Sequence, residues 1–583
     1  MKIPGPIRQQ MSSASVPPAG AELFSPRVVL IMALVVVAAV FAVYSPSLHF
    51  QFILDDHRFL GDPRVQSSGH VWEYFTNFAW SQFRGGPLSF YRPLFLLWLR
   101  LNFIFNGTSS WGWHFFSIVK HAAVAVLLGL LVWKLLRDRV AALMAATLFA
   151  LHPAQAESVA WVTVPDPLLS AAALGTLLFY LRYEGRDGGD GQPETGKPRG
   201  KSRKQNQGKF KPDSSSGWLV ASVLACLAAL MAKETAIVLP VVLFALALTM
   251  PFTRHDASEA AAGAVAGLRI QLAAAFRKTL PFLCVTAAYL LLRFHVLGGK
   301  LSPPTQSLPW KTVLLSWPAT LWFYVKVLLW PVRQRAFADP YLAEMFSWRG
   351  VLLPGLGVVC ALVILAVASF WGLKRARRAL PEREAIGVER ALLLGSLLLV
   401  LPILPALNLN ALNPGDFLHG RYTYLPLAGL MLLLATGWHL AKKGQAVLLS
   451  AATVVAVSFA VLTVKQEGMW KDDLTLFTVA HESAPNDGPV AQSLSRAHVQ
   501  VALGLDEAGR CDEAMRIFQQ AIQQYPEDWY AWAGMGECLV KLNDLPGAEQ
   551  SLRRATELSK EPRVKEEWQE VRARLGLSSL PPE

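Results

Sequence analysis

Apolar residues in this chain fall into runs of about 17–25 residues separated by short polar breaks, and an α-helix of that length crosses the hydrocarbon core of a membrane. The pattern predicts an all-α, polytopic membrane protein with about 11 transmembrane helices. A further apolar stretch, residues 310–330, is interrupted by Pro318, Lys326 and Pro331, so we expect it to be re-entrant or interfacial. The predicted spans are residues 28–44, 114–136, 140–151, 168–183, 218–232, 236–252, 279–297, 351–373, 391–407, 422–440 and 446–464.

The pattern changes after Trp470, where a repeat with a period of 34 residues replaces the long apolar runs. Small and aromatic residues return at matching places in two successive units. This spacing is typical of tetratricopeptide repeats, in which small residues let paired helices pack closely. We therefore predict a C-terminal α-solenoid over residues 466–577 that binds a protein partner or acceptor. The recurring positions are Ala514, Phe518, Ala521 and Pro526 in one unit, and Ala548, Leu552, Ala555 and Lys560 in the next.

The net charge of +13 is concentrated in short loops between the predicted spans, and basic loops of this kind face the cytoplasm. Nucleic-acid binding is not expected, because no basic module with a recognisable fold is present. The orientation predicts a disordered cytoplasmic tail over 1–27, an external loop over 45–113 and a cytoplasmic linker over 184–217. An odd number of spans then places the repeats outside. The basic loops are residues 134–139, 197–211, 269–278, 374–390 and 442–443.

Composition agrees with this architecture, since 53% of the residues are hydrophobic and the mean hydropathy is +0.33. The five cysteines add no motif. Cys226, Cys284 and Cys360 lie in apolar runs and are interpreted as small core residues. Cys511 and Cys538 lie in the C-terminal helices without metal-ligand spacing, so no metal site is predicted.

Two adjacent carboxylates, Asp55 and Asp56, follow the first predicted span. Carboxylates so close to lipid are either solvated in a loop or held in a polar cavity at the membrane edge. In a cavity, a carboxylate can take the proton of an attacking hydroxyl, and two together can shift a pKa or hold a divalent metal. We expect Asp55 or Asp56 to be the catalytic base of a membrane-embedded enzyme. The residues alone do not distinguish between the two.

Several motifs carry a family resemblance. In chain order they are FILDD at 52–56, YRPL at 91–94, LHPAQAESVAWV at 151–162, KET at 233–235, LPVV at 239–242, LLWPV at 328–332 and GRYTYLP at 420–426. With them and the terminal repeats, the chain resembles the transmembrane and tetratricopeptide-repeat mannosyltransferase-like proteins. These belong to the GT-C glycosyltransferase superfamily, which includes the protein O-mannosyltransferases. The segments VTVPDP at 162–167 and GDFLHGRYTYLP at 415–426 depart from the pattern expected for such relatives.

The resemblance implies transfer of a sugar from a polyprenyl-phosphate carrier, usually with inversion, at the outer face of the membrane. It implies that an acidic residue of the first external loop is the base and that basic residues near the interface hold the lipid phosphate. Arg421, Lys233 and Arg92 are candidates for the phosphate, although each could instead anchor the interface. Lys233 could also pair with its neighbour Glu234. The remaining candidate substrate-binding residues are His152 and Glu157 in a sugar pocket and Asp166 as a second acidic group.

We therefore predict a glycosyltransferase that moves a monosaccharide, with mannose the first candidate, from a polyprenyl-phosphate donor to a protein or glycan acceptor. One alternative is a non-catalytic membrane scaffold whose repeats assemble protein partners. Another is a carrier of a lipid-linked sugar that has no transfer chemistry. No resident cofactor is predicted, although a divalent metal remains an alternative at the carboxylate pair. The expected location is a bacterial inner membrane with periplasmic repeats, or the endoplasmic reticulum membrane in a eukaryote.

Overall fold

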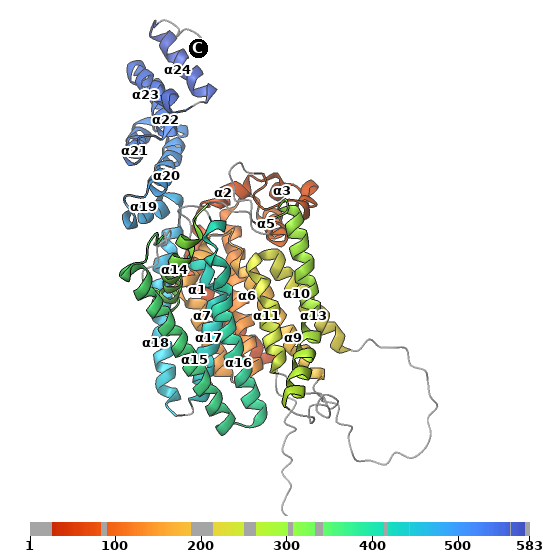
Figure 1. Cartoon of the computed structure of the whole chain (residues 1–583). Helices are drawn as coiled ribbons and strands as arrows, with labels where there is room; N and C mark the ends of the chain where they lie inside the picture. The colour runs from red at the N-terminus through yellow and green to blue at the C-terminus, as the bar shows by residue number, and fades with distance from the viewer. Residues whose placement is uncertain are drawn as a thin grey trace, which may run out of the picture.

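The computed structural model describes residues 26–82, 90–187, 214–249, 264–300, 307–332, 342–412, 418–441, 443–559 and 561–577. Every regular element within these ranges is a helix. Figure 1 shows a bundle of long helices and, on one end of it, a rod of shorter helices. The all-α prediction is therefore confirmed. Most of the predicted tail over 1–27 and of the linker over 184–217 lies outside the described residues.

Among the described residues, each predicted span overlaps a helix of the bundle. Eight helices among the described residues are long and apolar enough to cross a membrane, which supports an integral membrane protein; the exact number of crossings stays a prediction. The helices at the predicted spans are α1 (Pro26–Tyr44), α6 (Ser110–Leu136), α7 (Arg139–Leu151), α9 (Asp166–Asp187), α10 (Ser214–Ala232), α11 (Leu239–Leu248), α13 (Ala264–Val296), α15 (Leu353–Ala379), α16 (Glu382–Val400), α17 (Tyr424–Leu440) and α18 (Gln445–Glu467).

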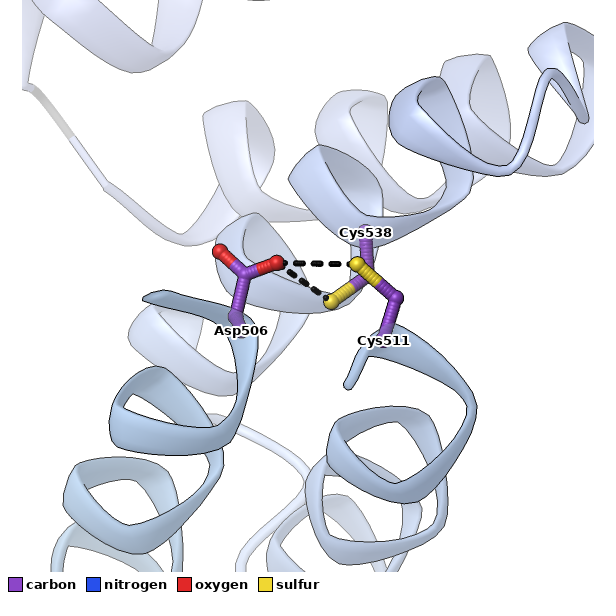
Figure 2. A group of neighbouring side chains, drawn as sticks. All are labelled: Asp506, Cys511 and Cys538. Atoms are coloured by element: carbon purple, nitrogen blue, oxygen red, sulfur yellow. Dashed lines mark hydrogen bonds between the residues drawn. The ribbon is translucent and has the colours of Figure 1, made fainter. Parts of the chain in front are cut away.

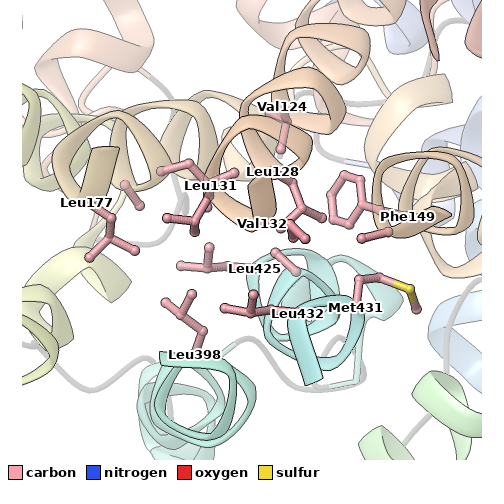
Figure 3. Packing of buried hydrophobic residues seen from close by; sticks show 14 of the residues in the cluster. Val124, Leu128, Leu131, Val132, Phe149, Leu177, Leu398, Leu425, Met431 and Leu432 are labelled. Carbon is pink, nitrogen blue, oxygen red and sulfur yellow. The ribbon is translucent and has the colours of Figure 1, made fainter. Parts of the chain in front are cut away.

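Helix α6 lies at the centre of the bundle. Its buried residues Val124, Leu128, Leu131 and Val132 face α7, α9, α16 and α17, as Figure 3 shows. Helices α16 and α17 approach most closely at Gly429, where an added Cβ would lie 2.5 Å from the backbone nitrogen of Leu399. Small residues at such crossings allow the backbone contacts that hold helices together in lipid.

Short helices cover the end of the bundle that also carries the rod, and we call this the external end (Figure 1). They are formed by the segments that connect or extend the long helices. They comprise η1 (Ser45–His49), α2 (Asp55–Leu60), α3 (Pro63–Gln66), η2 (Ser68–His70), α4 (Glu73–Thr76), α5 (Pro93–Asn106), η3 (Pro153–Gln155), α8 (Ala156–Ala160), η4 (Glu234–Val238), η5 (Trp348–Leu352), η6 (Leu401–Leu407), η7 (Leu409–Ala411), η8 (Gly420–Thr423) and η9 (Gly468–Trp470).

Helix α14 (Trp310–Leu329) is one of the eight helices long enough to span, but its contacts place it along the external end. The indole nitrogen of Trp317 donates to the carbonyl of Leu407, between α16 and α17, at 3.0 Å. Near the other end of the helix, the carbonyl of Leu328 lies 3.2 Å from Nε2 of His152, which follows α7. Both partners belong to external loops. These contacts favour the re-entrant or interfacial position expected for residues 310–330, and whether this segment spans the membrane stays a prediction.

The rod consists of antiparallel helix pairs. Positions 534 and 536 have no room for a larger residue than glycine. A Cβ added to Gly534 would lie 2.4 Å from the Phe518 ring, and one added to Gly536 would lie 2.6 Å from Leu552. The repeated alanines, including Ala514 and Ala548, are fully buried. The predicted solenoid is thus confirmed. Its helices are α19 (Asp473–Ser483), α20 (Gly488–Glu507), α21 (Cys511–Gln524), α22 (Trp529–Lys541), α23 (Leu545–Leu558) and α24 (Pro562–Arg574).

Candidate functional site

Ion pairs at the external end join loops that are far apart in the sequence. Arg92, before α5, binds both carboxylate oxygens of Glu234 at 2.9 and 2.6 Å. Nζ of Lys233 lies 2.6 Å from Oδ1 of Asp166, at the start of α9, and both side chains are buried. The suggested pairing of Lys233 with Glu234 is therefore wrong. Lys233 has an extended backbone (φ −159°, ψ 139°), and successive side chains of an extended chain point in opposite directions.

Glu157 organises a second cluster with His419 and Arg421. The backbone nitrogen of Arg421 donates to Oε2 of Glu157 at 3.1 Å, and its Nη1 lies 3.5 Å from Oε1. Nδ1 of His419 lies 3.0 Å from the same Oε1, close enough for an ion pair but outside hydrogen-bond geometry. The guanidinium of Arg421 lies 4.4 Å from the ring centroid of Trp161. Burial alone would raise the pKa of Glu157, but His419 and Arg421 lower it below its ordinary value.

The ionised form of Glu234 is stabilised more strongly than that of Glu157. Burial opposes ionisation, yet the Arg92 guanidinium holds the pKa of Glu234 at about 2. The pair therefore stays ionised at any physiological pH. Because Glu234 lies between α10 and α11, the pair ties the first external loop to these two helices. Tyr422 adds an aromatic wall, since Nζ of Lys233 lies 4.6 Å from its ring centroid.

Sequence reasoning missed Lys120, a cation in the external half of α6. The residue is only 8% exposed. Its Nζ lies 5.3 Å from the ring centroid of Trp98, and no carboxylate in the described part of the chain pairs with it. Asp56 and Asp166 act on it only through longer-range electrostatics. A lone lysine inside a predicted span was the signal that could have identified it, because an ionisable residue at that depth is costly without a partner.

The two adjacent carboxylates have different surroundings. Asp56 is fully buried: Oδ1 accepts from the backbone nitrogen and hydroxyl of Thr163 at 3.1 and 2.7 Å, and Oδ2 accepts from the backbone nitrogen of Ile53 at 3.2 Å. Burial raises the pKa of Asp56 to about 7 despite these hydrogen bonds. Asp55 is partly exposed. Asp56 thus ties α2 to the loop before α9, whereas Asp55 is the more accessible of the two.

The turn that presents this pair is strained and is held by the rod. Leu54 has φ 52° and ψ −121°, a conformation that favours glycine. Its backbone nitrogen donates to Oδ1 of Asp473, the first residue of α19, at 3.0 Å. Oδ2 of Asp473 lies 3.1 Å from Nε2 of His57, and this hydrogen bond raises the pKa of His57. The base of the rod therefore contacts the segment that carries Asp55.

His152 lies apart from the ionic clusters. Its Nδ1 accepts from the backbone nitrogen of Ala154 at 3.2 Å, and its Nε2 contacts the carbonyl of Leu328. The ring is fully buried and packs against Phe459. The structure thus places His152 as a cap between α7 and α14. The other predicted site residues are brought together at the external end.

The comparisons with known proteins fall on the same parts of the chain. A tetratricopeptide repeat family model matches residues 507–575. Protein O-mannosyl-transferase TMTC3 of Mus musculus is 25% identical over 545 residues, covering 88% of this chain and 53% of that protein. Protein O-mannosyl-transferase TMTC1 of Homo sapiens is 26% identical over 529 residues, covering 85% of this chain and 55% of that protein. The chain spans about half the length of these curated relatives.

Among solved structures, the apo oligosaccharyltransferase of Archaeoglobus fulgidus aligns with 79% of this chain and 58% of its own chain, at 12% identity and a TM-score of 0.39. The sequence relatives align with both the bundle and the repeats, since they cover 85% or more of this chain. Along most of its length the chain is similar to the transmembrane and tetratricopeptide-repeat O-mannosyl-transferases, as its motifs indicated.

Proposed function

We propose that the protein is a membrane glycosyltransferase that moves a monosaccharide from a polyprenyl-phosphate carrier to a hydroxyl of a protein or glycan. Mannose is the first candidate sugar, because the relatives are named for O-mannosyl transfer. The observation that carries the proposal is Lys120, a buried cation beside a carboxylate-bearing loop at the external end of an apolar helix bundle. The donor phosphate would reach it directly from the lipid.

Charge balance supports an anionic ligand at Lys120. The cations Arg92, Lys233 and Arg421 each have a carboxylate partner, whereas Lys120 has none among the described side chains. A polyprenyl-phosphate sugar is a phosphodiester with one negative charge. A second charge develops on the phosphate as the bond to the anomeric carbon breaks. A lysine at this point stabilises that charge more in the transition state than in the bound donor, which accelerates transfer.

We assign the base to Asp55 and a positioning role to Asp56. The acceptor oxygen attacks the anomeric carbon, its proton passes to the Asp55 carboxylate, and the sugar–phosphate bond breaks to release polyprenyl phosphate. Attack opposite the leaving group inverts the anomeric centre. Asp56 is less suited to accept the proton, because both of its oxygens already accept hydrogen bonds that hold α2 in place. The same occupancy argues against a divalent metal between the two carboxylates.

The other predicted residues hold the loops around this point. The pairs Arg92–Glu234 and Lys233–Asp166 fix the loops before α5, α9 and α11, and Glu157 fixes the loop that carries Arg421. Arg421 stacks on the buried Trp161 ring, and its partly exposed guanidinium can contact a sugar hydroxyl. The repeats stand at the same end, so they can deliver a protein acceptor. This end faces the periplasm of a bacterium or the lumen of the endoplasmic reticulum.

The test uses purified full-length protein and a radiolabelled polyprenyl-phosphate mannose donor with protein or glycan acceptors. Asp55→Asn and Lys120→Met should each reduce transfer by about 10²-fold or more, because a general base and a charge stabiliser each contribute at that scale. Lys326→Met, an exposed lysine of α14, is the matched control and should transfer normally. Transfer should persist in EDTA. Normal transfer by both Asp55→Asn and Lys120→Met would refute these roles.

The runner-up is a non-catalytic scaffold whose repeats assemble partners. The rod supports it, since tetratricopeptide solenoids present extended binding surfaces. Absence of transfer with every polyprenyl-phosphate sugar, from protein that is folded and still binds a partner through residues 507–575, would favour this function.

A further inference from the structure

Three potential metal ligands meet inside the rod. Asp506 lies in the last turn of α20, Cys511 begins α21 and Cys538 lies on α22, and Figure 2 shows their side chains converging. Both thiols contact the same carboxylate oxygen: Sγ of Cys511 lies 3.0 Å and Sγ of Cys538 lies 3.2 Å from Oδ1 of Asp506. All three side chains are buried, and their ligand atoms lie within 4.8 Å of one another. The described residues contain one such group.

The spacing matches the needs of zinc with small adjustments. A tetrahedral Zn²⁺ with bonds of about 2.3 Å to sulfur and about 2.0 Å to oxygen separates two sulfurs by about 3.8 Å, and a sulfur from an oxygen by about 3.5 Å. The observed sulfur–oxygen distances are a few tenths of an ångström shorter.

Charge also allows a divalent ion. The second carboxylate oxygen, Oδ2 of Asp506, pairs with Nζ of Lys541 at 2.6 Å, which leaves Oδ1 directed at the sulfurs. With neutral thiols, the carboxylate and Lys541 cancel each other. Replacing the two thiol protons by one divalent cation gives two thiolates, a carboxylate, Lys541 and the ion, which again sum to zero. The exchange releases two protons, and no net charge is buried.

We propose that Asp506, Cys511 and Cys538 form a zinc site that cross-links three consecutive helices of the rod. The ion takes two thiolates and one carboxylate oxygen, and a water molecule or a donor from a bound partner completes the tetrahedron. This set of ligands suits Zn²⁺ because the metal prefers sulfur, nitrogen and carboxylate ligands in a tetrahedral, four-coordinate arrangement. The site is independent of the proposed transferase activity.

Binding at this site depends on pH. Zinc is bound by thiolates, so uptake of the ion exchanges the two thiol protons for the metal. Affinity should rise with pH, by about tenfold per unit for each proton released.

The experiment uses full-length protein in detergent, reduced, stripped with a chelator, and reloaded with Zn²⁺ or Co²⁺. Elemental analysis should find about one ion per chain after dialysis, and Co²⁺ should show thiolate charge-transfer absorption. The C511S/C538S variant should lose the ion. The C284S/C360S variant is the matched control, since both of these cysteines lie in bundle helices α13 and α15, and it should retain the ion.

X-ray absorption of zinc-loaded wild-type protein provides a test that does not depend on the variant folding. It should show two sulfur scatterers together with oxygen or nitrogen. Failure of the reduced wild-type protein to take up zinc would overturn the proposal, whether the protein as isolated carries free thiols or a Cys511–Cys538 disulfide. Equal uptake by C511S/C538S and wild-type protein would overturn it as well.

Discussion

The strained turn at Leu54 should make transfer depend on Asp473, a residue of the rod. A non-glycine residue in the left-handed half of the backbone map costs about 1–2 kcal/mol. The part-buried hydrogen bond from the backbone nitrogen of Leu54 to the Asp473 carboxylate contributes about 1.5–3 kcal/mol, which is enough to hold the turn. Asp473→Ala removes the acceptor, so the turn relaxes and the carboxylate pair moves. Because about 1.4 kcal/mol is a factor of ten, we expect kcat/KM to fall about 10- to 100-fold.

A second substitution tests the physical reason for this loss. Leu54→Gly removes the steric cost of the positive φ, so the Leu54→Gly/Asp473→Ala double variant should recover about tenfold of the lost rate. Asp472→Ala is the matched control. Asp472 caps α19 by accepting from the backbone nitrogen of Thr475 at 2.7 Å, and it makes no hydrogen bond to the turn. This variant should lose about 1 kcal/mol of stability and keep its transfer rate.

The assay is initial-rate transfer from the polyprenyl-phosphate donor, with the unfolding temperature of each variant measured in the same detergent. Wild-type kcat/KM in Asp473→Ala would refute the reasoning. So would a double variant no faster than Asp473→Ala, because the loss would then come from another role of Asp473.

Three further predictions concern stability. Asp473 raises the pKa of His57, so their contact stabilises the fold fully at pH values below the ordinary histidine pKa near 6.5, and this stabilisation is lost as pH rises through the folded-state pKa. His57→Gln should therefore reduce the change in unfolding temperature between pH 5 and 9. The reduction should be modest, because the His57 side chain is 56% exposed. Asp166→Asn should cost about 3–5 kcal/mol by leaving Lys233 buried without its carboxylate, and Asp166→Asn/Lys233→Met should recover most of it; an additive double variant in thermal unfolding would contradict the pairing. Gly429→Ala should cost about 1–3 kcal/mol, because its Cβ would overlap the α16 backbone, whereas Gly437→Ala on the same helix meets nothing within 4 Å and should unfold like the wild type.

The residues of the site were mostly identifiable from the chain, but their partners were not. Asp56, Glu157, Asp166, Lys233 and Glu234 stood out because charged residues beside apolar runs are few. Their ion-pair partners could not be predicted, because the side chains that meet come from loops separated by tens to hundreds of residues. Lys233 binds Asp166 and not its neighbour Glu234. The extended backbone at Lys233 decides which carboxylate its side chain meets, and the pattern of neighbouring residues in the sequence does not reveal that backbone conformation.

The proposed zinc ligands also could not be predicted from the sequence. Cys511 and Cys538 have no metal-ligand spacing, because the three ligands come from three different helices. Only the antiparallel packing of α21 against α22 brings the start of one beside the end of the other, and the end of α20 adds Asp506.

The sequence by itself determined the class of the protein, the helices of the bundle, the repeats and the end of the molecule that carries the charged loops. It could do so because lipid requires long apolar helices and because repeat packing requires small residues at a fixed period. The tertiary structure alone decided which carboxylate is accessible, that Lys120 lacks a carboxylate partner among the described residues, and that Asp473 holds the turn before Asp55. Those outcomes depend on which helix faces meet, and contacts between distant segments set them.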